Sequence, residues 1–471
     1  MLLAKTPDHL RQLAANWDVI VVGAGLAGSE CALQLAHRFQ WRVGLIEMRP
    51  ECKSPAHHTP YAAELVCSNS LGSMNPDSAP QALKWEAEQL GSFILAAAKR
   101  NSVPAGQALA VDRNLFSQDI NELIEKTPLI QRVTYHVTSL DELPRPLVIA
   151  TGPLTSDPLA TSLRQYLGKE FLYFFDAIAP IVASDSIDMS KVFRQSRYQK
   201  GGDDYLNCPL TKEEYYRLVD EIARAEKVLP KDFDQIPFFE GCMPIETMVE
   251  RGPDTLRFGP LKPVGLQPPG WSTAPYAVVQ LRQDNLDGTA YNMVGFQTRM
   301  KYHEQIRIFR MIPGLEQAEF LKLGSLHRNL YLHSPSRLNP NLSSKKDPDI
   351  FFAGQIVGVE GYFESACMGL LCAHFVDAFL RQIPIPYPPR ESFLGSLWHA
   401  IVSDYRSSQF HPININFGLL PPLLPSEVDQ IKSKEKNPEL RKKSLRSIQI
   451  KKAQVAFSSW INSLPYPKSK N

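Results

Sequence analysis

The chain has 471 residues, of which 44% are hydrophobic and 21% are charged, so it is long and apolar enough to form two domains or one domain with a large insertion. A net charge of +2 neither requires nor excludes a nucleic-acid partner. Residues 1–17 include Lys5, Asp8 and Arg11 and lack the continuous apolar run of a signal peptide. No later stretch has the uninterrupted apolar length of a membrane span. These features predict a cytoplasmic protein with no membrane contact.

The cysteines predict reduced thiols and no metal site. Their number is odd, and a chain without an export signal is expected to keep them reduced. No CxxC spacing occurs, and the pair His57-His58 lacks partners at ligand spacing. The seven are Cys31, Cys52, Cys67, Cys208, Cys242, Cys367 and Cys372.

The first fifty residues carry a dinucleotide-binding fingerprint. The apolar run DVIVV (residues 18–22) ends in the turn GAGLAG, and the next segment has helical spacing of apolar positions. A second apolar run, RVGLIEM, places Glu47 nineteen residues after Gly28. Backbone N–H groups at the helix start would face a pyrophosphate, and Glu47 would accept hydrogen bonds from a ribose diol. The predicted cofactor contacts here are Gly23, Ala24, Gly25, Leu26, Ala27, Gly28 and Glu47.

This fingerprint leaves FAD and NAD open, and a later segment favours FAD. In DIFFAGQIVGVEGYFESACMGLLCAHFVDAF (residues 349–379), an apolar strand at 350–353 runs into a glycine-rich turn and a helix of small residues. In two-part flavoproteins such a segment directs a helix N-terminus at the flavin ring. A second ordinary strand–turn–helix unit would share this pattern. The predicted contacts are Gly354, Gln355, Gly358 and Gly361.

The fold predicted is α/β: a Rossmann-like FAD-binding domain of the glutathione-reductase type, interrupted by an inserted α+β domain. An apolar strand and turn, LVIATGPLTS (residues 147–156), precede a long region dense in aromatic residues and prolines, with few helical patterns. The predicted division is an N-terminal extension (1–16), the first part of the FAD domain (17–170), the insertion (171–323), the second part of the FAD domain (324–425) and a basic C-terminal tail (426–471).

The basic tail is a candidate for contact with a phosphate backbone. Residues 432–452, KSKEKNPELRKKSLRSIQIKK, hold nine Lys or Arg and two Glu, a local charge of +7. Leu440, Leu445, Ile448 and Val455 are expected to form an apolar stripe along one helix, opposite a basic face. A solvated helix that only increases solubility is the alternative interpretation.

A series of motifs resembles one family, the folate- and FAD-dependent tRNA (uracil-5-)-methyltransferases (TrmFO), from about Trp17 to Leu424. Besides the fingerprint, the motifs are ELVCSNS, LYFFDAIAPIV, DSIDM, DYLNCPLT, FFEGCMPIE, RGPDTLRFGPLKPVG, YAVVQLRQDN, YNMVGFQTR, FRMIPGLEQAEF, FFAGQIVGVEGY and NINFGLLPPL, in this order. The resemblance implies transfer of a one-carbon unit from 5,10-methylenetetrahydrofolate to C5 of the T-loop uridine in the T-arm of tRNA. It also implies reduced FAD as electron donor, regenerated by NADH or NADPH.

The resemblance also implies two functional thiols, Cys67 in ELVCSNS and Cys242 in FFEGCMPIE. A thiolate that adds to C6 of uracil makes C5 nucleophilic, and a second group must assist removal of the C5 proton. Cys242 resembles the nucleophile at C6, and Cys67 resembles the partner in proton removal or methylene transfer. Polar or turn-forming neighbours surround both cysteines, whereas Cys31, Cys208, Cys367 and Cys372 are expected to pack as small hydrophobic residues.

Further candidate residues have weaker support. Tyr362 in GVEGYFES would lie near the flavin and could gate the site or relay a proton, or it could be a core tyrosine. His57 and His58 could contact the folate, the flavin or the tRNA backbone, but a role in loop hydrogen bonding is the favoured interpretation. Candidate contacts with phosphate or with folate carboxylates are Arg257, Lys262, Arg282 and Arg299, although a surface charge is the commoner role of any one of them.

Three alternatives stay open on the sequence alone. A related FAD-dependent enzyme modifies wobble uridines, but FFEGCMPIE, RGPDTLRFGPLKPVG and the compact C-terminus argue against it. A small-molecule flavin oxidoreductase would have no use for the basic segment. An inactive tRNA-binding module would not need both Cys67 and Cys242.

Overall fold

The computed structural model describes residues 2–54, 56–168, 171–199, 202–228, 243–384, 387–403 and 410–465. Its central element is a six-stranded sheet in the order β1-β7-β3-β2-β8-β17, in which all neighbouring strands are parallel. The strands are β1 (Leu2–Leu3), β2 (Val19–Val22), β3 (Val43–Glu47), β7 (Ile130–Thr134), β8 (Leu147–Ile149) and β17 (Ile350–Phe352). All residues of β2, β3, β8 and β17 are buried, because helices cover both faces of the sheet. The predicted Rossmann-like α/β fold is confirmed.

Two helices from opposite ends of the sequence pack together on this sheet. The helix α2 (Leu26–Leu33), which follows the glycine turn, continues as one π-helical segment, Gln34–Arg38, and packs against α12 (Tyr362–Arg381). Among the described residues, α12 is the one helix long and apolar enough to cross a membrane, but 89% of its most apolar stretch is buried. It is therefore a core helix. The other helices of this part are α3 (Ala79–Gln89), α4 (Phe93–Arg100), α5 (Arg113–Glu125), α6 (Asp157–Leu167), α11 (Ser334–Arg337) and α13 (Phe393–Val402).

The N-terminal segment predicted as an extension contributes to the same sheet. Strand β1 pairs with β7 at the sheet edge, and α1 (Pro7–Ala14) buries Leu10 and Ala14.

A small antiparallel sheet lies at the opposite end of this part, next to the loop that carries Cys67. Its strands are β4 (Ser70–Ser73), β5 (Ser102–Val103) and β6 (Ala108–Val111).

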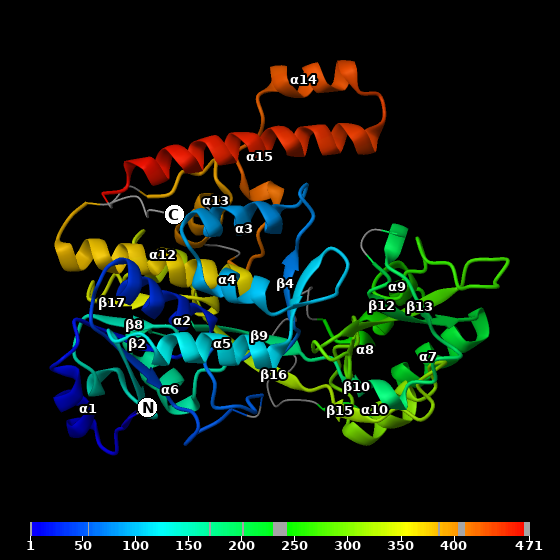
Figure 1. Cartoon of the computed structure of the whole chain (residues 1–471), viewed down its shortest axis with the longest axis horizontal. Helices are drawn as coiled ribbons and strands as arrows, with labels where there is room; N and C mark the ends of the chain where they lie inside the picture. Colours follow the sequence, from blue (N-terminus) through cyan, green and yellow to red (C-terminus); the bar gives the residue numbers. More distant parts are fainter. Residues whose placement is uncertain are drawn as a thin grey trace.

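A second body, green in Figure 1, contains the predicted insertion. Its six-stranded antiparallel sheet has the order β11-β12-β13-β14-β10-β15 and its own apolar core. The strands β9 (Phe171–Ala177) and β16 (Leu326–Leu332) pair with each other and form the two connections to the first body. The strands of the sheet are β10 (Ile181–Ala183), β11 (Phe193–Arg194), β12 (Tyr205–Leu210), β13 (Ala277–Gln283), β14 (Ala290–Met293) and β15 (Phe320–Lys322), and the helices are α7 (Lys212–Arg224), α8 (Ile245–Glu250), α9 (Thr255–Phe258) and α10 (Tyr302–Phe309).

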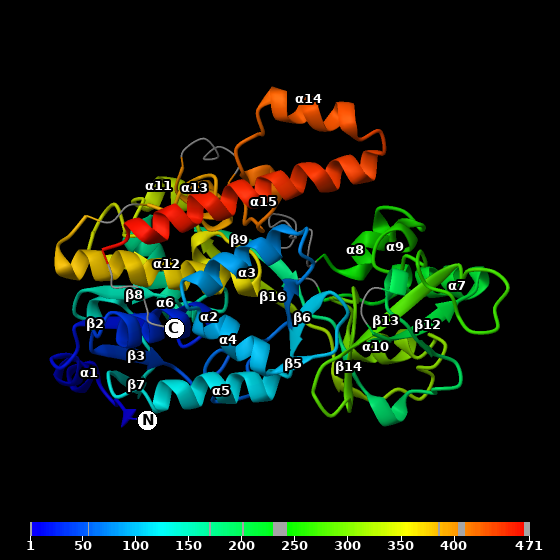
Figure 2. The same ribbon diagram turned by 45° about the horizontal axis from the view of Figure 1, so that its top comes forward.

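The C-terminal residues form a hairpin of two helices, α14 (Pro425–Lys434) and α15 (Pro438–Ser463). Figures 1 and 2 both show the hairpin on one side of the first body, with α14 and the start of α15 projecting beyond α13. The second half of α15 is anchored by Ala453, Phe457 and Trp460, which are buried. The four residues of the predicted stripe lie on one helix, but Leu440 and Val455 are 50% and 70% exposed, because α15 is anchored on the body through a different face.

Candidate active site

A groove runs along the carboxyl ends of β2, β3, β8 and β17, where the parallel strands bring distant loops together. It consists of two adjoining pockets that share Gly25, His57, Thr151 and Leu154. At one end, here called the Glu47 end, the lining includes Val22, Ile46, Met48, Arg49, Tyr135, His136 and Leu159. At the other, the Cys67 end, it includes Ala27, Glu64, Val66, Gly152, Asn329, Gly354, Gln355 and Tyr362. The elongated shape fits a dinucleotide.

The glycine turn leaves room for a phosphate group at the middle of this groove. Gly25 lines both pockets and is the N-cap of α2, and a Cβ built on it would meet no atom within 4 Å. Gly23 and Gly28 differ from it. Gly23 has φ +99°, and a Cβ built on it would lie 2.6 Å from the carbonyl oxygen of Ala150. A Cβ built on Gly28 would lie 1.8 Å from the carbonyl oxygen of Gly23. Gly23 and Gly28 therefore serve the packing of the turn, while Gly25 borders open space that a pyrophosphate fits.

The starts of two helices approach the Cys67 end of the groove. Leu26 and Ala27 in the first turn of α2 line the Cys67 end, as do Tyr362 and Ser365 in the first turn of α12. The positive ends of the two helix dipoles give the groove a potential suited to an anionic cofactor. Of the predicted contacts on the late segment, Gly354 and Gln355 line the groove, whereas Gly358 and Gly361 shape the turn before α12 and do not line it.

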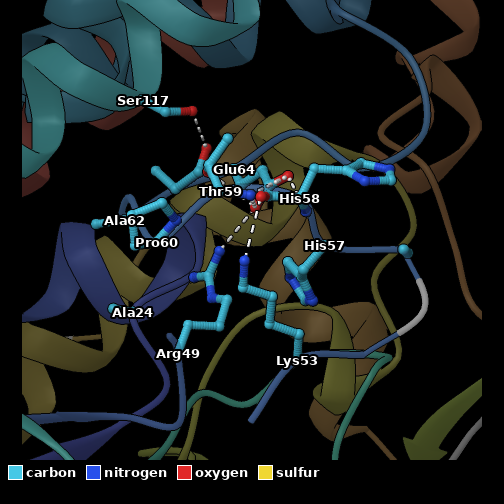
Figure 3. A network of polar contacts seen from close by, with 12 residues as sticks. Ala24, Arg49, Lys53, His57, His58, Thr59, Pro60, Ala62, Glu64 and Ser117 are labelled. Carbon is cyan, nitrogen blue, oxygen red and sulfur yellow. Dashed lines mark hydrogen bonds and ion pairs between the residues drawn. The ribbon is translucent and has the colours of Figure 1, made fainter. Parts of the chain in front are cut away.

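Glu47 lies at its expected place and is held by an arginine that the sequence analysis did not single out. Its carboxylate accepts hydrogen bonds from the Ala24 amide at 2.9 Å and from Arg49 Nε at 2.9 Å. Arg49, 2% exposed, also pairs with Glu64 at 3.0 Å, and Figure 3 shows it pointing toward that carboxylate. Burial alone would raise the pKa of Glu47, but the charge of Arg49 and its hydrogen bonds lower it to about 2. Glu47 is therefore an ionised, fixed acceptor on the groove wall.

Glu47→Gln should reduce stability more at neutral pH than in acid. The folded-state pKa of about 2 lies below the ordinary value of 4.5, so ionisation of Glu47 stabilises the fold above pH 4.5, and this contribution is lost as pH falls toward 2. From these two pKa values, the loss in free energy of unfolding should be about 2 kcal/mol greater at pH 7 than at pH 3. Urea unfolding at both pH values measures it. Exposed Glu51→Gln is the control, and an equal loss for Glu47→Gln at both pH values would contradict the prediction.

Cys67 and Tyr362 meet at the far end of the groove. Both are half-buried and line it, and the Cys67 amide donates a hydrogen bond of 2.6 Å to the Tyr362 hydroxyl. The Cys67 thiol is 3.9 Å from the Ala177 carbonyl oxygen. The structure thus brings Cys67 and Tyr362 together with Gly354 and Gln355, residues that lie almost 300 positions further along the chain.

Cys242 lies outside the described residues, as does the whole segment 229–242. The cysteines expected to be structural, Cys31, Cys208, Cys367 and Cys372, are all buried. Burial raises the pKa of Cys208 and Cys367, and the hydrogen bond to Cys372 together with burial raises that of Cys31. Cys31, Cys208 and Cys367 are therefore protonated, and all four cysteines are buried as expected.

The two histidines differ in their surroundings. His57 lies in the groove and its Nδ1 is 2.7 Å from Ser54 Oγ, and burial followed by the nearby charge of Arg49 lowers its pKa to about 4. His57 is therefore neutral at physiological pH. His58 is exposed, and its amide donates to Glu64 at 2.8 Å. Both form loop hydrogen bonds as predicted, and His57 also lies on the groove wall.

The four basic candidates in the insertion do not form one site. Arg299 is 5% exposed and pairs with Glu250 at 3.3 Å, so its interpretation as an anion contact is wrong. Arg282, 9% exposed, donates to Asn69. Arg257 lies over the Tyr276 ring, and Lys262 is exposed.

Comparison with known proteins places the chain in one family. The family model described as "Glucose inhibited division protein A" (GIDA) matches residues 18–384. Among solved structures, GidA of Aquifex aeolicus superposes with a TM-score of 0.64 at 15% identity, covering 97% of this chain and 74% of that one, which shows the shared fold. The chain belongs to the GIDA family.

Its relatives within that family are closer. A protein of Bdellovibrio bacteriovorus named methylenetetrahydrofolate–tRNA-(uracil-5-)-methyltransferase TrmFO is 59% identical, covering 91% of this chain and 97% of its own. A protein of the same name from Geobacter sulfurreducens is 52% identical, covering 91% of this chain and 98% of its own. The chain therefore belongs to the TrmFO family, as its motifs predicted.

Proposed function

We propose that this protein uses FAD and 5,10-methylenetetrahydrofolate to methylate C5 of a uridine in tRNA, and that the target is the T-loop uridine. The observation that carries the proposal is the thiol of Cys67 at one end of a groove shaped for a dinucleotide. The names of relatives that share half or more of their residues with this chain supply the reaction and the one-carbon donor.

The described residues fit FAD. Glu47 would accept hydrogen bonds from the ribose, the open side of Gly25 would face the pyrophosphate, and the starts of α2 and α12 would direct N–H groups at the anionic parts of the cofactor. Reduced FAD, regenerated by NADH or NADPH, supplies the two electrons that convert a transferred methylene group into a methyl group.

The two thiols divide the chemistry of the uracil ring. Cys242, as a thiolate, adds to C6, and the electron pair moved to C5 attacks the methylene carbon. Loss of the C5 proton with departure of tetrahydrofolate would leave a methylene group on C5, and its reduction by two electrons and a proton would give the methyl group as the Cys242 thiolate is eliminated and the ring is restored. We assign to Cys67 the removal of that proton or assistance to methylene transfer, since it lies beside Gly354 and Tyr362 at the Cys67 end of the groove. Tyr362 fixes the Cys67 backbone through its hydroxyl.

The C-terminal hairpin is the proposed contact with the tRNA backbone. Residues 425–463 hold nine basic and four acidic residues, a net charge of +5, whereas the other 432 residues carry 42 basic and 45 acidic ones. A polyanion is therefore attracted to the hairpin. It also contacts the body through Lys443, which pairs at 3.2 Å with Asp77.

Removing hairpin charge should weaken tRNA binding and flatten its salt dependence. Lys434, Lys436, Lys442 and Lys451 are exposed, and in the described part of the chain no ion pair engages them. If each contacts a phosphate, changing all four to Gln should reduce the slope of log K against log salt by about 3. Filter binding over a salt series measures the slope. The control changes four exposed lysines elsewhere to Gln: Lys5, Lys99, Lys126 and Lys212. An unchanged slope would remove the hairpin from tRNA binding.

The function itself is tested by incubating purified protein with unmodified tRNA, NADPH and tetrahydrofolate labelled in the methylene group. Nucleoside analysis should find label in 5-methyluridine, located in the T-loop. Label at the anticodon would instead favour wobble-uridine modification. Oxidation of NADPH by a flavin-containing protein without labelled tRNA would favour a small-molecule oxidoreductase.

A further inference from the structure

The loop that carries Cys67 is held by charged side chains instead of by a strand. Residues 64–69 have no helix or strand, so their carbonyl groups need other partners. Arg113 donates through Nη1 to the Leu65 carbonyl at 2.8 Å and through Nη2 to the Cys67 carbonyl at 2.9 Å. Lys322 Nζ donates to the Val66 carbonyl between them at 3.0 Å. Three successive carbonyls thus accept hydrogen bonds from two cations.

Several of these contacts cross from the second body to the first. Lys322 lies on β15 of the second sheet, and Arg113, at the start of α5 in the first body, pairs at 3.0 Å with Asp284, directly after β13. Asn69 lies at the end of the Cys67 loop. Its side-chain oxygen accepts a hydrogen bond from Arg282 Nε at 3.0 Å, and its side-chain nitrogen donates one to the Gln283 carbonyl at 3.0 Å. The end of β13 therefore contacts the Cys67 loop directly through Arg282 and Gln283, and indirectly through Asp284, which pairs with Arg113.

The ion pair between Arg113 and Asp284 is buried, with the side chains 13% and 8% exposed. Burial alone would lower the pKa of Arg113, but the charge of Asp284 raises it above its ordinary value. A buried guanidinium that loses its paired carboxylate is strongly destabilised, so Asp284 keeps Arg113 in the orientation that bonds the loop. Burial and the charge of Arg113 lower the pKa of Lys322, the other cation.

The same body also holds the residues that directly follow Cys242. Met243 and Ile245 are buried, and the Ile245 amide donates to the Gln297 carbonyl at 2.7 Å, shortly after β14. Strand β14 pairs with β13, whose end contacts the Cys67 loop. The Cys67 loop and the described residues that follow Cys242 are therefore bonded to segments at the ends of two neighbouring strands of one sheet.

We infer that Arg113, Asp284 and Lys322 are positioning residues, through which the second body sets the place of the Cys67 thiol at the cofactor groove. Their effect on turnover rests on the proposed function. Their effect on the order of the loop does not, so the two can be measured separately.

The test compares Asp284→Asn with the wild-type protein, both loaded with flavin. Hydrogen–deuterium exchange of the peptide containing residues 64–70 should become at least tenfold faster, because Arg113 loses its counter-charge, while flavin content stays unchanged. The turnover number for methyl transfer should fall about 100-fold, the scale expected for a misplacement of about 1 Å, with KM for tRNA within twofold. Asp284→Glu should restore turnover and loop protection.

Asp287→Asn, on the same loop but exposed, is the matched control and should behave as wild type. Unchanged exchange of residues 64–70 in Asp284→Asn would overturn the inference, as would a loss of turnover that Asp284→Glu does not restore. If Asp284→Asn does not fold, Lys322→Met, which removes one hydrogen bond from a half-buried side chain, must show the same faster exchange. If even the wild-type protein transfers no methyl group, the proposed function fails, and the exchange experiment still decides the role of these residues.

Discussion

Gly25→Val is expected to yield a folded protein that binds no flavin. The valine side chain meets no atom of the chain within 4 Å at its Cβ, and Gly25 has φ −73°, which any residue adopts, so the turn can keep its shape. The side chain would instead occupy the middle of the groove, where the start of α2 faces the pyrophosphate. A branched side chain there both fills the space and blocks the N–H groups.

Flavin absorbance of the purified variant, relative to protein concentration, measures the effect, and thermal unfolding checks the fold. We expect at least a tenfold loss of bound flavin. Gly28→Val is the informative contrast, because its Cβ would lie 1.8 Å from the Gly23 carbonyl oxygen and should prevent correct folding. A full complement of flavin in Gly25→Val would show that the cofactor does not pass this turn.

The parts of the site that could be predicted from sequence are those whose chemistry is local. The turn Gly23–Gly28 and the acid Glu47 follow strands that are recognisable as apolar runs, and a parallel sheet brings the carboxyl ends of such strands to one edge. Since β17 joins the same edge, Gly354 and Gln355 were also predictable. Thr151 and Leu154 follow β8 in the same way and could have been found by asking what comes after that strand.

The residues that were missed depend on contacts between distant segments. Arg113 and Asp284 are 171 positions apart, and no pattern near either one indicates the other. Arg49 follows Glu47 closely, but its role depends on Glu64, which reaches it only through the fold of the loop. The buried face of α15 could not be predicted for a related reason. Helical periodicity shows which residues share a face, but the packing of α15 decides which face is buried.

Cys67→Ala and Cys242→Ala are both expected to abolish methyl transfer, but at different steps. Without Cys242 no thiolate adds to C6, so turnover should fall to background. Without Cys67 the loss should be about 10²- to 10⁴-fold, the range for a group that transfers a proton. Both variants should keep their flavin, since Cys67 lies at one end of the groove, away from the turn at Gly25 and from Glu47. Cys52→Ala, a half-buried thiol that lines neither pocket, is the matched control.

T-arm RNA containing 5-fluorouracil separates the two roles, because fluorine at C5 cannot leave as a proton and a thiol adduct at C6 persists after methylene transfer. Cys242→Ala should form no covalent complex that survives denaturing electrophoresis, whereas the wild-type protein and Cys52→Ala should form one. A complex that persists in Cys242→Ala but is lost in Cys67→Ala would exchange the two assignments. If Cys67→Ala methylates tRNA at the wild-type rate, Cys67 takes no part in the reaction, and the hydrogen bonds from Arg113 and Lys322 serve only to complete the loop.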